Sequence, residues 1–167
     1  MSELSRPSSA SRVALNRLMT VLDTNVLGNV HGGVIMRMVD EAGGAAAVRH
    51  SAGAAVTAAM DEMVFVMPVA VGDLLTAAAQ VNWTGRSSME IGVRVSAERL
   101  DQPDLPARHV ASAHLVFVAI DADGRPRPVP RIVPEDDDDR RRLREAEIRR
   151  KHRLERREAI LRSRRST

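Results

Sequence analysis

The chain has 167 residues, of which 44% are hydrophobic and only 2% aromatic. This length suits one compact domain, whose core must be built from Val, Ala, Leu, Ile and Met. The absence of cysteine excludes disulfides, thiolate metal sites and a cysteine nucleophile. No apolar run reaches the roughly 18 residues of a membrane helix.

Charge divides the chain into two parts. Residues 1–134 hold 12 basic and 13 acidic residues, whereas residues 135–167 hold 13 basic and 9 acidic residues. The net charge of +3 therefore arises from an arginine-rich tail and says little about the body of the protein.

The first third of the chain predicts one strand and one helix. Residues 1–12 are polar and rich in serine, which is typical of a flexible leader. Residues 13–22 predict a strand, and residues 23–33, rich in Asn, Gly and Asp, predict a loop. Residues 34–50 predict a helix, because apolar residues recur at helical spacing. Every residue from Ala42 to Ala47 is Ala or Gly, so another element can approach this helix closely.

Four strands are predicted after the helix, over residues 54–66, 74–83, 88–100 and 108–120. The third alternates most clearly, with Ile91, Val93 and Val95 on one face. Residues 121–134 contain four prolines and leave the sheet in extended form. This order predicts an α+β fold, in which an antiparallel sheet of about five strands wraps one long central helix, in a domain over residues 13–134.

Residues 135–167 form the arginine-rich C-terminal segment. The acidic run EDDDD precedes many Arg residues interleaved with Glu. Because apolar residues are too sparse for a fully buried face, we expect a solvated helix held by i,i+4 charge pairs, or a contact between subunits. Binding of nucleic acid or of a membrane surface is disfavoured, because the acidic run would repel phosphate and no aromatic residue is available for base stacking.

The junction between the loop and the helix is the most informative segment for function. Gly32 and Gly33 stand directly before the helix, where glycine lets the backbone approach a ligand closely. The first N–H groups of a helix have no partner within it and carry the positive end of its dipole. Such a turn can hold a carbonyl or an oxyanion. A glycine-rich turn that only starts a helix is the alternative.

Asp40 favours the functional interpretation. It lies in the middle of the helix that the sheet should wrap, where an unpaired buried carboxylate is costly; exposure to solvent is the alternative. With a rise of about 1.5 Å per residue, Gly32 and Asp40 of one helix lie roughly 12 Å apart. If both act on one carbonyl, Asp40 must come from a second subunit, which predicts a dimer with shared sites.

Five segments occur in the order found in one enzyme family. They are NVLGNVHGGVIMRMVDEAGG at residues 25–44, VTAAMDEMVF at 56–65, PVAVGD at 68–73, WTGRSSME at 83–90 and FVAIDADGRPRPVP at 117–130. This pattern resembles the hotdog-fold acyl-CoA thioesterases, in particular the branch of the cytosolic brain-type acyl-CoA hydrolase and its short bacterial relatives. The resemblance spans about residues 15–134 and implies hydrolysis of acyl-CoA to a free carboxylic acid and CoA.

The resemblance also implies roles for individual residues. Asp40 falls on the helix carboxylate that activates water or attacks the thioester carbon, and Gly32 falls on the N–H that polarises the carbonyl. Asn25 falls on the loop amide beside the carbonyl, and Thr57 on a strand residue that faces the site and holds the water. The other residues expected to line the site and bind substrate are Asn29, His31 and Gly33.

The turn over residues 85–88 is a second functional cluster. The N–H groups of a glycine turn, the guanidinium of Arg86 and the hydroxyls of Ser87 and Ser88 suit phosphate oxygens. An ordinary hairpin turn has the same composition, but the resemblance favours a site for the phosphates of CoA.

The resemblance implies a cytoplasmic homo-oligomer with sites at the dimer interface, and a trimer of dimers is the expected assembly. Acyl-CoA is the expected ligand. No metal and no separate cofactor is expected, because water is the second substrate and the sequence holds no ligand cluster. Two other functions stay open: a hotdog dehydratase or hydratase that pairs His31 with Glu41, and an acyl-CoA-binding module without catalysis. No linear pattern gives the preferred acyl chain length.

Overall fold

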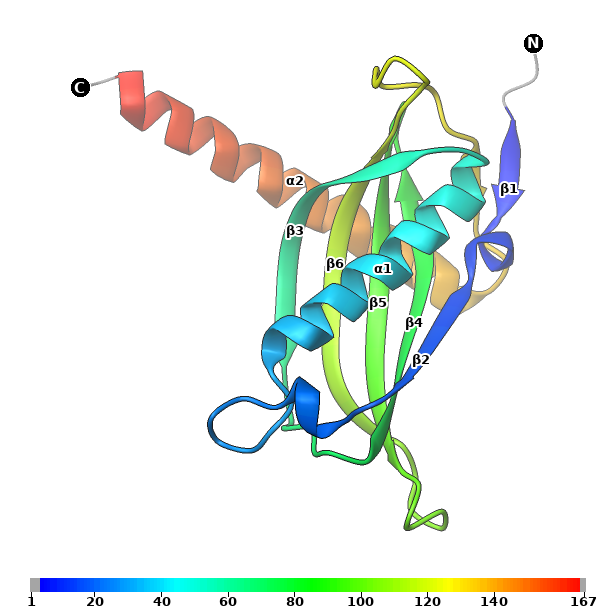
Figure 1. Cartoon of the computed structure of the whole chain (residues 1–167). Coiled ribbons are helices and arrows are strands. Elements are labelled where there is room, and N and C mark those ends of the chain that lie inside the picture. The colour runs from blue at the N-terminus through cyan, green and yellow to red at the C-terminus, as the bar shows by residue number, and fades with distance from the viewer. Residues whose placement is uncertain (1–3, 166–167) are drawn as a thin grey trace.

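The computed structural model describes residues 4–165, in which one antiparallel sheet carries a helix on each face (Figure 1). The strands of this sheet are β2 (Val13–Leu18), β3 (Ala55–Phe65), β4 (Asp73–Thr84), β5 (Ser88–Arg99) and β6 (Arg108–Ala119). Their spatial order is β2-β4-β5-β6-β3, and all neighbours pair antiparallel. The predicted α+β fold is confirmed, and β2 and β3 form the two edges of the sheet.

The helix α1 (Gly32–Ser51) crosses one face of the sheet and packs there through its small residues (Figure 1). Ala42, Ala46 and Ala47 have no exposed surface. A Cβ atom at Gly43 would lie only 3.0 Å from the ring of Phe117. The close approach that the run of Ala and Gly predicted is therefore confirmed.

Two predicted boundaries differ because polar side chains cap the elements. The first strand ends at Leu18 rather than at residue 22, since Asp23 accepts hydrogen bonds from the N–H and the hydroxyl of Thr20 (2.9 and 2.8 Å) and closes a 3₁₀ turn. The central helix begins at Gly32 rather than at residue 34, since Nδ1 of His31 accepts a hydrogen bond from the Gly33 N–H. Histidine is not among the residues that usually cap a helix.

The N-terminal segment, for which we expected a flexible leader, is tied to the body over its described part. β1 (Ser5–Pro7) pairs in parallel with β7 (Arg131–Val133), and the 3₁₀ turn Ser8–Ser11 follows. The buried hydroxyl of Ser11 accepts a hydrogen bond from the Val81 N–H of β4 (3.0 Å). Residues 1–3 lie outside the described residues.

The C-terminal helix α2 (Asp137–Arg165) crosses the face of the sheet opposite to α1 (Figure 1). Strand alternation explains this arrangement, because Ile91 of β5 points toward α1 whereas Glu90 binds Arg149 of α2 (2.7 Å). Ala146 of α2 is fully buried. The prediction of a solvated helix is wrong for the first half of α2, because a charged stripe packs on a sheet that offers opposite charges.

Candidate functional site

The loop before α1 is folded around the side chain of Asn25. Its Oδ1 accepts hydrogen bonds from the N–H groups of Leu27 (2.8 Å) and Asn29 (3.3 Å), and its own N–H donates to the carbonyl of Asn29 (2.7 Å). Gly28, with a φ of +80°, supplies the left-handed residue that closes the loop. Among the described residues, the NH₂ group of Asn25 has no hydrogen-bond acceptor, which leaves it as a donor for a ligand.

The first turn of α1 leaves one N–H group for a ligand. His31 lies at the N-cap and takes the Gly33 N–H at 2.9 Å. Its own N–H donates to the carbonyl of Asp23 (2.7 Å). Among the described residues, the Gly32 N–H has no hydrogen-bond acceptor. His31 and Gly33 therefore build the helix start, and Gly32 presents the unused donor.

A shallow pocket of roughly 350 Å³ lies at this turn. Asn25, Asn29 and Gly32 line it on one side, and the end of β3 with the segment after it closes the other side. The ring of Phe65 would lie 3.6 Å from a Cβ atom at Gly32. The apolar wall is formed by Ile35, Phe65, Val66, Met67, Pro68 and Val69, none of which we had predicted as a site residue.

The carboxylate of Asp40 lies elsewhere on α1. It accepts a hydrogen bond from the hydroxyl of Thr57 on β3 (2.7 Å), and both residues are exposed. The expectation that Asp40 is buried within one protomer is wrong, because the buried face of α1 is formed by neighbouring residues such as Met38 and Val39. Glu41, next to it, forms an exposed ion pair with Arg37 (2.9 Å).

The predicted catalytic residues thus form two groups within one protomer. Asn25 and Gly32 share the pocket at the start of α1, whereas Asp40 and Thr57 are bonded to each other and do not line it. Eight residues of helix separate Gly32 from Asp40, which is about 12 Å along the axis. One thioester carbonyl cannot touch both groups of the same protomer.

The third candidate part of the site is a broad basin at the opposite end of α1, with a volume of roughly 760 Å³. The predicted phosphate-binding residue Arg86 lines it together with Gly85 of the same turn. Ser87 and Ser88 belong to this turn, which is closed by the hydrogen bond from the Gly85 N–H to the Ser88 carbonyl (2.8 Å). The remaining lining residues include three further arginines and no acidic residue: Leu4, Arg6, Ser51, Ala52, Thr84, Arg127, Pro128, Val129, Pro130 and Arg131.

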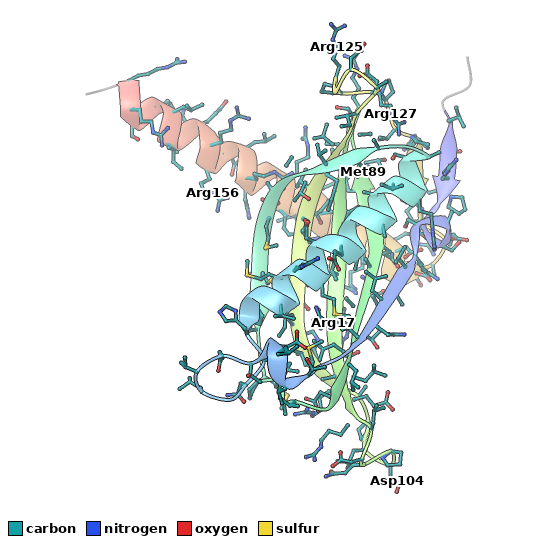
Figure 2. The ribbon with its side chains drawn as sticks, in the orientation of Figure 1. Arg17, Met89, Asp104, Arg125, Arg127 and Arg156 are labelled. Carbon is teal, nitrogen blue, oxygen red and sulfur yellow. The ribbon has the colours of Figure 1, made fainter. Side chains whose placement is uncertain are left out.

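Arg127 and His50 hold the wall of this basin in place. The guanidinium of Arg127 donates to the carbonyls of Ser51 (3.0 Å) and Ile120 (3.1 Å), and so fixes the end of α1 (Figure 2). Burial lowers the pKa of His50, so the neutral ring donates from Nε2 to the Pro130 carbonyl (2.9 Å). The carbonyl of Arg86 accepts a hydrogen bond from the Val129 N–H (2.9 Å). Its exposed guanidinium makes no hydrogen bond or ion pair with any other described residue, which leaves its charge for a ligand.

Two kinds of feature are missing from residues 4–165. No group of three or more His, Cys, Asp or Glu side chains is arranged to hold a metal ion. No helix of this part of the chain is long and apolar enough to cross a membrane.

Known proteins resemble this chain both in sequence and in fold. The family model of the thioesterase superfamily matches residues 27–103. An uncharacterized acyl-CoA thioester hydrolase of Bacillus subtilis is 36% identical over 77% of this chain and 74% of its own length. The chain belongs to the thioesterase superfamily. It spans only about a third (36%) of the mouse cytosolic acyl coenzyme A thioester hydrolase, with which it is 35% identical over 82% of its own length.

Solved structures of thioesterases agree with the fold. A hexameric acyl-CoA thioesterase without ligand superimposes with a TM-score of 0.88 at 35% identity, covering 92% of this chain and 97% of the other. An acyl-CoA hydrolase of Staphylococcus aureus, solved with butyryl coenzyme A and coenzyme A, gives 0.87 at 31% identity, covering 95% and 96%. The hotdog thioesterase fold predicted from the sequence is confirmed.

Three solved variants of the Staphylococcus aureus hydrolase carry alanine in place of one Asn, one Asp and one Thr. In that enzyme the Asn precedes the Asp by 15 residues and the Thr follows the Asp by 17 residues. The same two spacings separate Asn25, Asp40 and Thr57.

Proposed function

We propose that this thioesterase-superfamily chain hydrolyses acyl-CoA to a free carboxylic acid and CoA at a site shared by two protomers. The observation that carries the proposal is the division of the catalytic groups along α1. Donors for a carbonyl lie at its first turn, and a carboxylate held by Thr57 lies in its middle. Relatives are named acyl-CoA thioester hydrolases, and the matching Asn, Asp and Thr spacings support the same three residues.

The free edge of β3 supports a dimer that joins the two groups. β3 is an edge strand, and several large apolar residues are exposed on it, beyond it and on the neighbouring face of α1. These residues are Met36, Val56, Val64, Phe65, Val66 and Met67. An exposed edge with apolar side chains is a template for pairing with another strand. When two β3 strands pair about a twofold axis, the two α1 helices run antiparallel, and the first turn of one faces the middle of the other.

The reaction then follows from the donors and acceptors of the combined site. Asp40 of one protomer takes a proton from water, and the water oxygen attacks the thioester carbon. The Gly32 N–H and the Asn25 NH₂ of the other protomer stabilise the tetrahedral oxyanion. The C–S bond breaks, the sulfur leaves as the CoA thiolate and is protonated, and the carboxylic acid is released. Attack by Asp40 itself, followed by hydrolysis of the anhydride, uses the same geometry.

The basin around Arg86 is proposed to hold the phosphates of CoA. Its four arginines supply positive charge without an acidic neighbour in the lining, and guanidinium groups bind phosphate with paired hydrogen bonds. Ser87 and Ser88 are proposed to add hydroxyl donors from the same turn. The reaction requires no metal and no cofactor, because water is the second substrate.

The geometry argues against the dehydratase alternative. A dehydratase would need His31 and Glu41 as a catalytic pair, but His31 caps α1 and Glu41 is paired with Arg37 on the helix surface. An acyl-CoA-binding module without catalysis would not need the Asp40–Thr57 pair.

Assembly, location and domain limits complete the proposal. Several relatives are described as hexameric, which supports a trimer of dimers for this chain. The mammalian relatives are named cytosolic, which supports a cytoplasmic location. We keep residues 13–134 as the catalytic domain, with residues 1–12 and 135–167 as its two extensions.

The test is release of free thiol from a panel of acyl-CoAs of increasing chain length, followed with a thiol-reactive dye. The chain has no cysteine, so it adds no background. Turnover on at least one member is expected, and the profile reports the chain-length preference. Tight binding of acyl-CoA without turnover on any member would replace the proposal with a binding module.

A further inference from the structure

The second half of α2 continues past the edge of the sheet. In Figure 1, α2 passes behind β4, β5 and β6 and extends beyond β3. Arg153 forms an ion pair with Asp61 of β3, the last strand. Residues 154–165 extend about 18 Å farther, and all of them are exposed. With strands about 4.8 Å apart, this length reaches across roughly three strands.

The face of α2 that packs on the sheet continues into this overhang. Ala146, Arg149 and Arg153 contact the sheet, at spacings of three and four residues. The same spacing continues through Arg156, Ile160 and Arg164, which therefore lie on one side of the helix with the first three residues. Ile160 is 45% exposed. These six residues are the packing stripe of α2, and beyond Arg156 the stripe continues past β3, the last strand of its own protomer (Figure 1).

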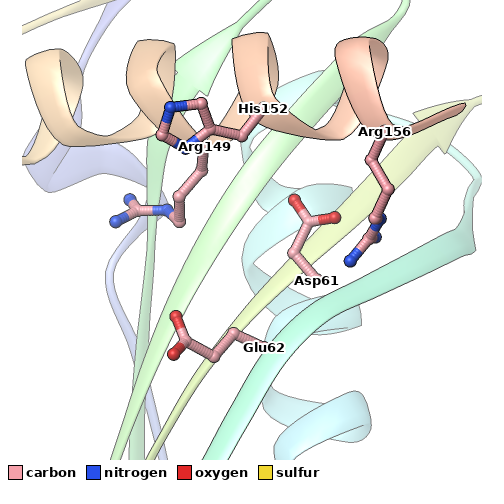
Figure 3. Close-up of a pocket in the computed structure, with 5 residues that line it drawn as sticks. All are labelled: Asp61, Glu62, Arg149, His152 and Arg156. Atoms are coloured by element: carbon pink, nitrogen blue, oxygen red, sulfur yellow. The ribbon is translucent and has the colours of Figure 1, made fainter. Parts of the chain in front are cut away.

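The charge of the overhang complements the outer face of β3. Residues 154–165 hold five arginines and two glutamates. Where α2 passes over β3, Asp61 and Glu62 face Arg149, His152 and Arg156 across a cavity of roughly 390 Å³ (Figure 3). Figure 3 shows Arg156 beside Asp61 at the point where the helix leaves the sheet. In a second copy of β3 beyond the edge, Asp61 is bound by its own Arg153, and the exposed carboxylate of Glu62 is offered to the overhang.

We propose that residues 154–165 are an intersubunit strap, which lies on the outer face of the β3 strand of a second copy of this chain. The proposal rests on the proposed pairing of β3 edges, which extends the sheet under the overhang. Each dimer then holds two straps, one from each protomer, which run in opposite directions. Ile160 packs on the sheet of the second copy, and the arginines of the stripe face the exposed Glu62 of its β3 strand.

The test compares two isoleucines of the same helix. Ile160 lies on the packing stripe, whereas Ile148, 55% exposed, lies on the opposite side of α2. Ile160→Asp and Ile148→Asp carry the same loss of helix propensity and the same added charge. Sedimentation velocity over a dilution series measures the dissociation constant of the dimer. Circular dichroism checks that both variants keep their helix content.

Ile160→Asp is expected to raise the dimer dissociation constant by about tenfold or more, and Ile148→Asp to leave it within about twofold of the wild type. Equal dissociation constants for the two variants would overturn the strap. So would an Ile160→Asp variant that splits a hexamer into intact dimers, because the overhang would then contact a different dimer. These readouts do not involve turnover, so an inactive wild-type protein would contradict the proposed function and leave the strap untouched.

Discussion

The first turn of α1 and the middle of the same helix differ in the chemistry that they offer. The first turn holds backbone and amide donors beside a pocket and contains no carboxylate. The middle holds a carboxylate and a hydroxyl on an exposed surface, outside that pocket. Neither region hydrolyses a thioester alone. Under the proposed function, each protomer presents two half-sites, and a catalytic site is complete only where two protomers meet.

The largest effect is expected at the carboxylate. Asp40→Asn should lower kcat by about 10²-fold or more, because an amide does not accept the proton of water. The fold should survive, since Asp40 is exposed and the amide oxygen still accepts the hydrogen bond of Thr57. Thiol release at saturating acyl-CoA measures the loss. Glu41→Gln is the matched control and should stay near the wild type. A folded Asp40→Asn variant with full turnover would remove Asp40 from the mechanism.

A smaller loss is expected at the first turn of α1. In Gly32→Ala, the added methyl group lies in the pocket beside the N–H donor, and kcat/KM should fall by about tenfold or more. The fold should tolerate it, because the Cβ atom lies 3.6 Å from Phe65, an ordinary contact. Gly44→Ala places a Cβ atom at the same distance from Phe117 and should not lower turnover. Equal kinetics of the two variants would show that the pocket does not receive the carbonyl.

Thr57 should matter less than Asp40, because it positions the carboxylate rather than reacting. Thr57→Val keeps the shape of the side chain but removes the hydrogen bond to Asp40, and kcat should fall by about threefold to tenfold. Thr57→Ser restores the hydroxyl and should recover most of the rate. A Ser variant as slow as the Val variant would assign the loss to packing.

The smallest effect on turnover is expected outside both half-sites, on the face of the sheet under α2. Burial, assisted by the charge of Arg149, lowers the pKa of His114 from its usual 6.5 to about 4. The unfolded chain therefore binds a proton before the folded chain does as the pH falls. The contribution of the neutral His114 to the free energy of unfolding is therefore fully present above pH 6.5 and is lost progressively as the pH falls toward 4.

In His114→Asn, the free energy of unfolding should depend less on pH in this window, as urea titrations at several pH values would show. Thiol release at pH 7 should not change. An unaltered pH dependence would contradict this role of His114.

The structure could be predicted from the sequence where apolar residues recur at the period of a helix or a strand. The run of Ala and Gly in α1 and the alternation in β5 gave the central helix and the sheet. The docking of α2 was missed because its packing stripe is charged, and because its partners, Glu90 and Asp61 among them, lie on strands that are distant in the sequence. The apolar wall around Phe65 was missed because its residues face a pocket that only the folded loop creates. Asp40 was expected to be buried, since the sequence does not distinguish the face of α1 that the sheet covers from the face that stays exposed in one protomer.

The structure also changes one expectation about the C-terminal segment. From the sequence, deletion of residues 135–167 should leave catalysis largely intact in a protein that still assembles. Asp139 and Ala146 are buried, and Asp139 binds Ser8 and Gln80 of the body. Deletion of the whole segment would expose this face, so single substitutions such as Ile160→Asp are the better probes.

Subunit complementation tests the shared site most directly. Asp40→Asn and Asn25→Ala each damage both sites of their own dimers, but a mixed dimer contains one site with an intact Asn25 and an intact Asp40. Random exchange in an equal mixture should therefore restore about one quarter of the wild-type turnover. Native mass spectrometry confirms that mixed dimers have formed. A mixture that exchanges fully but stays as inactive as its parents would contradict the shared site.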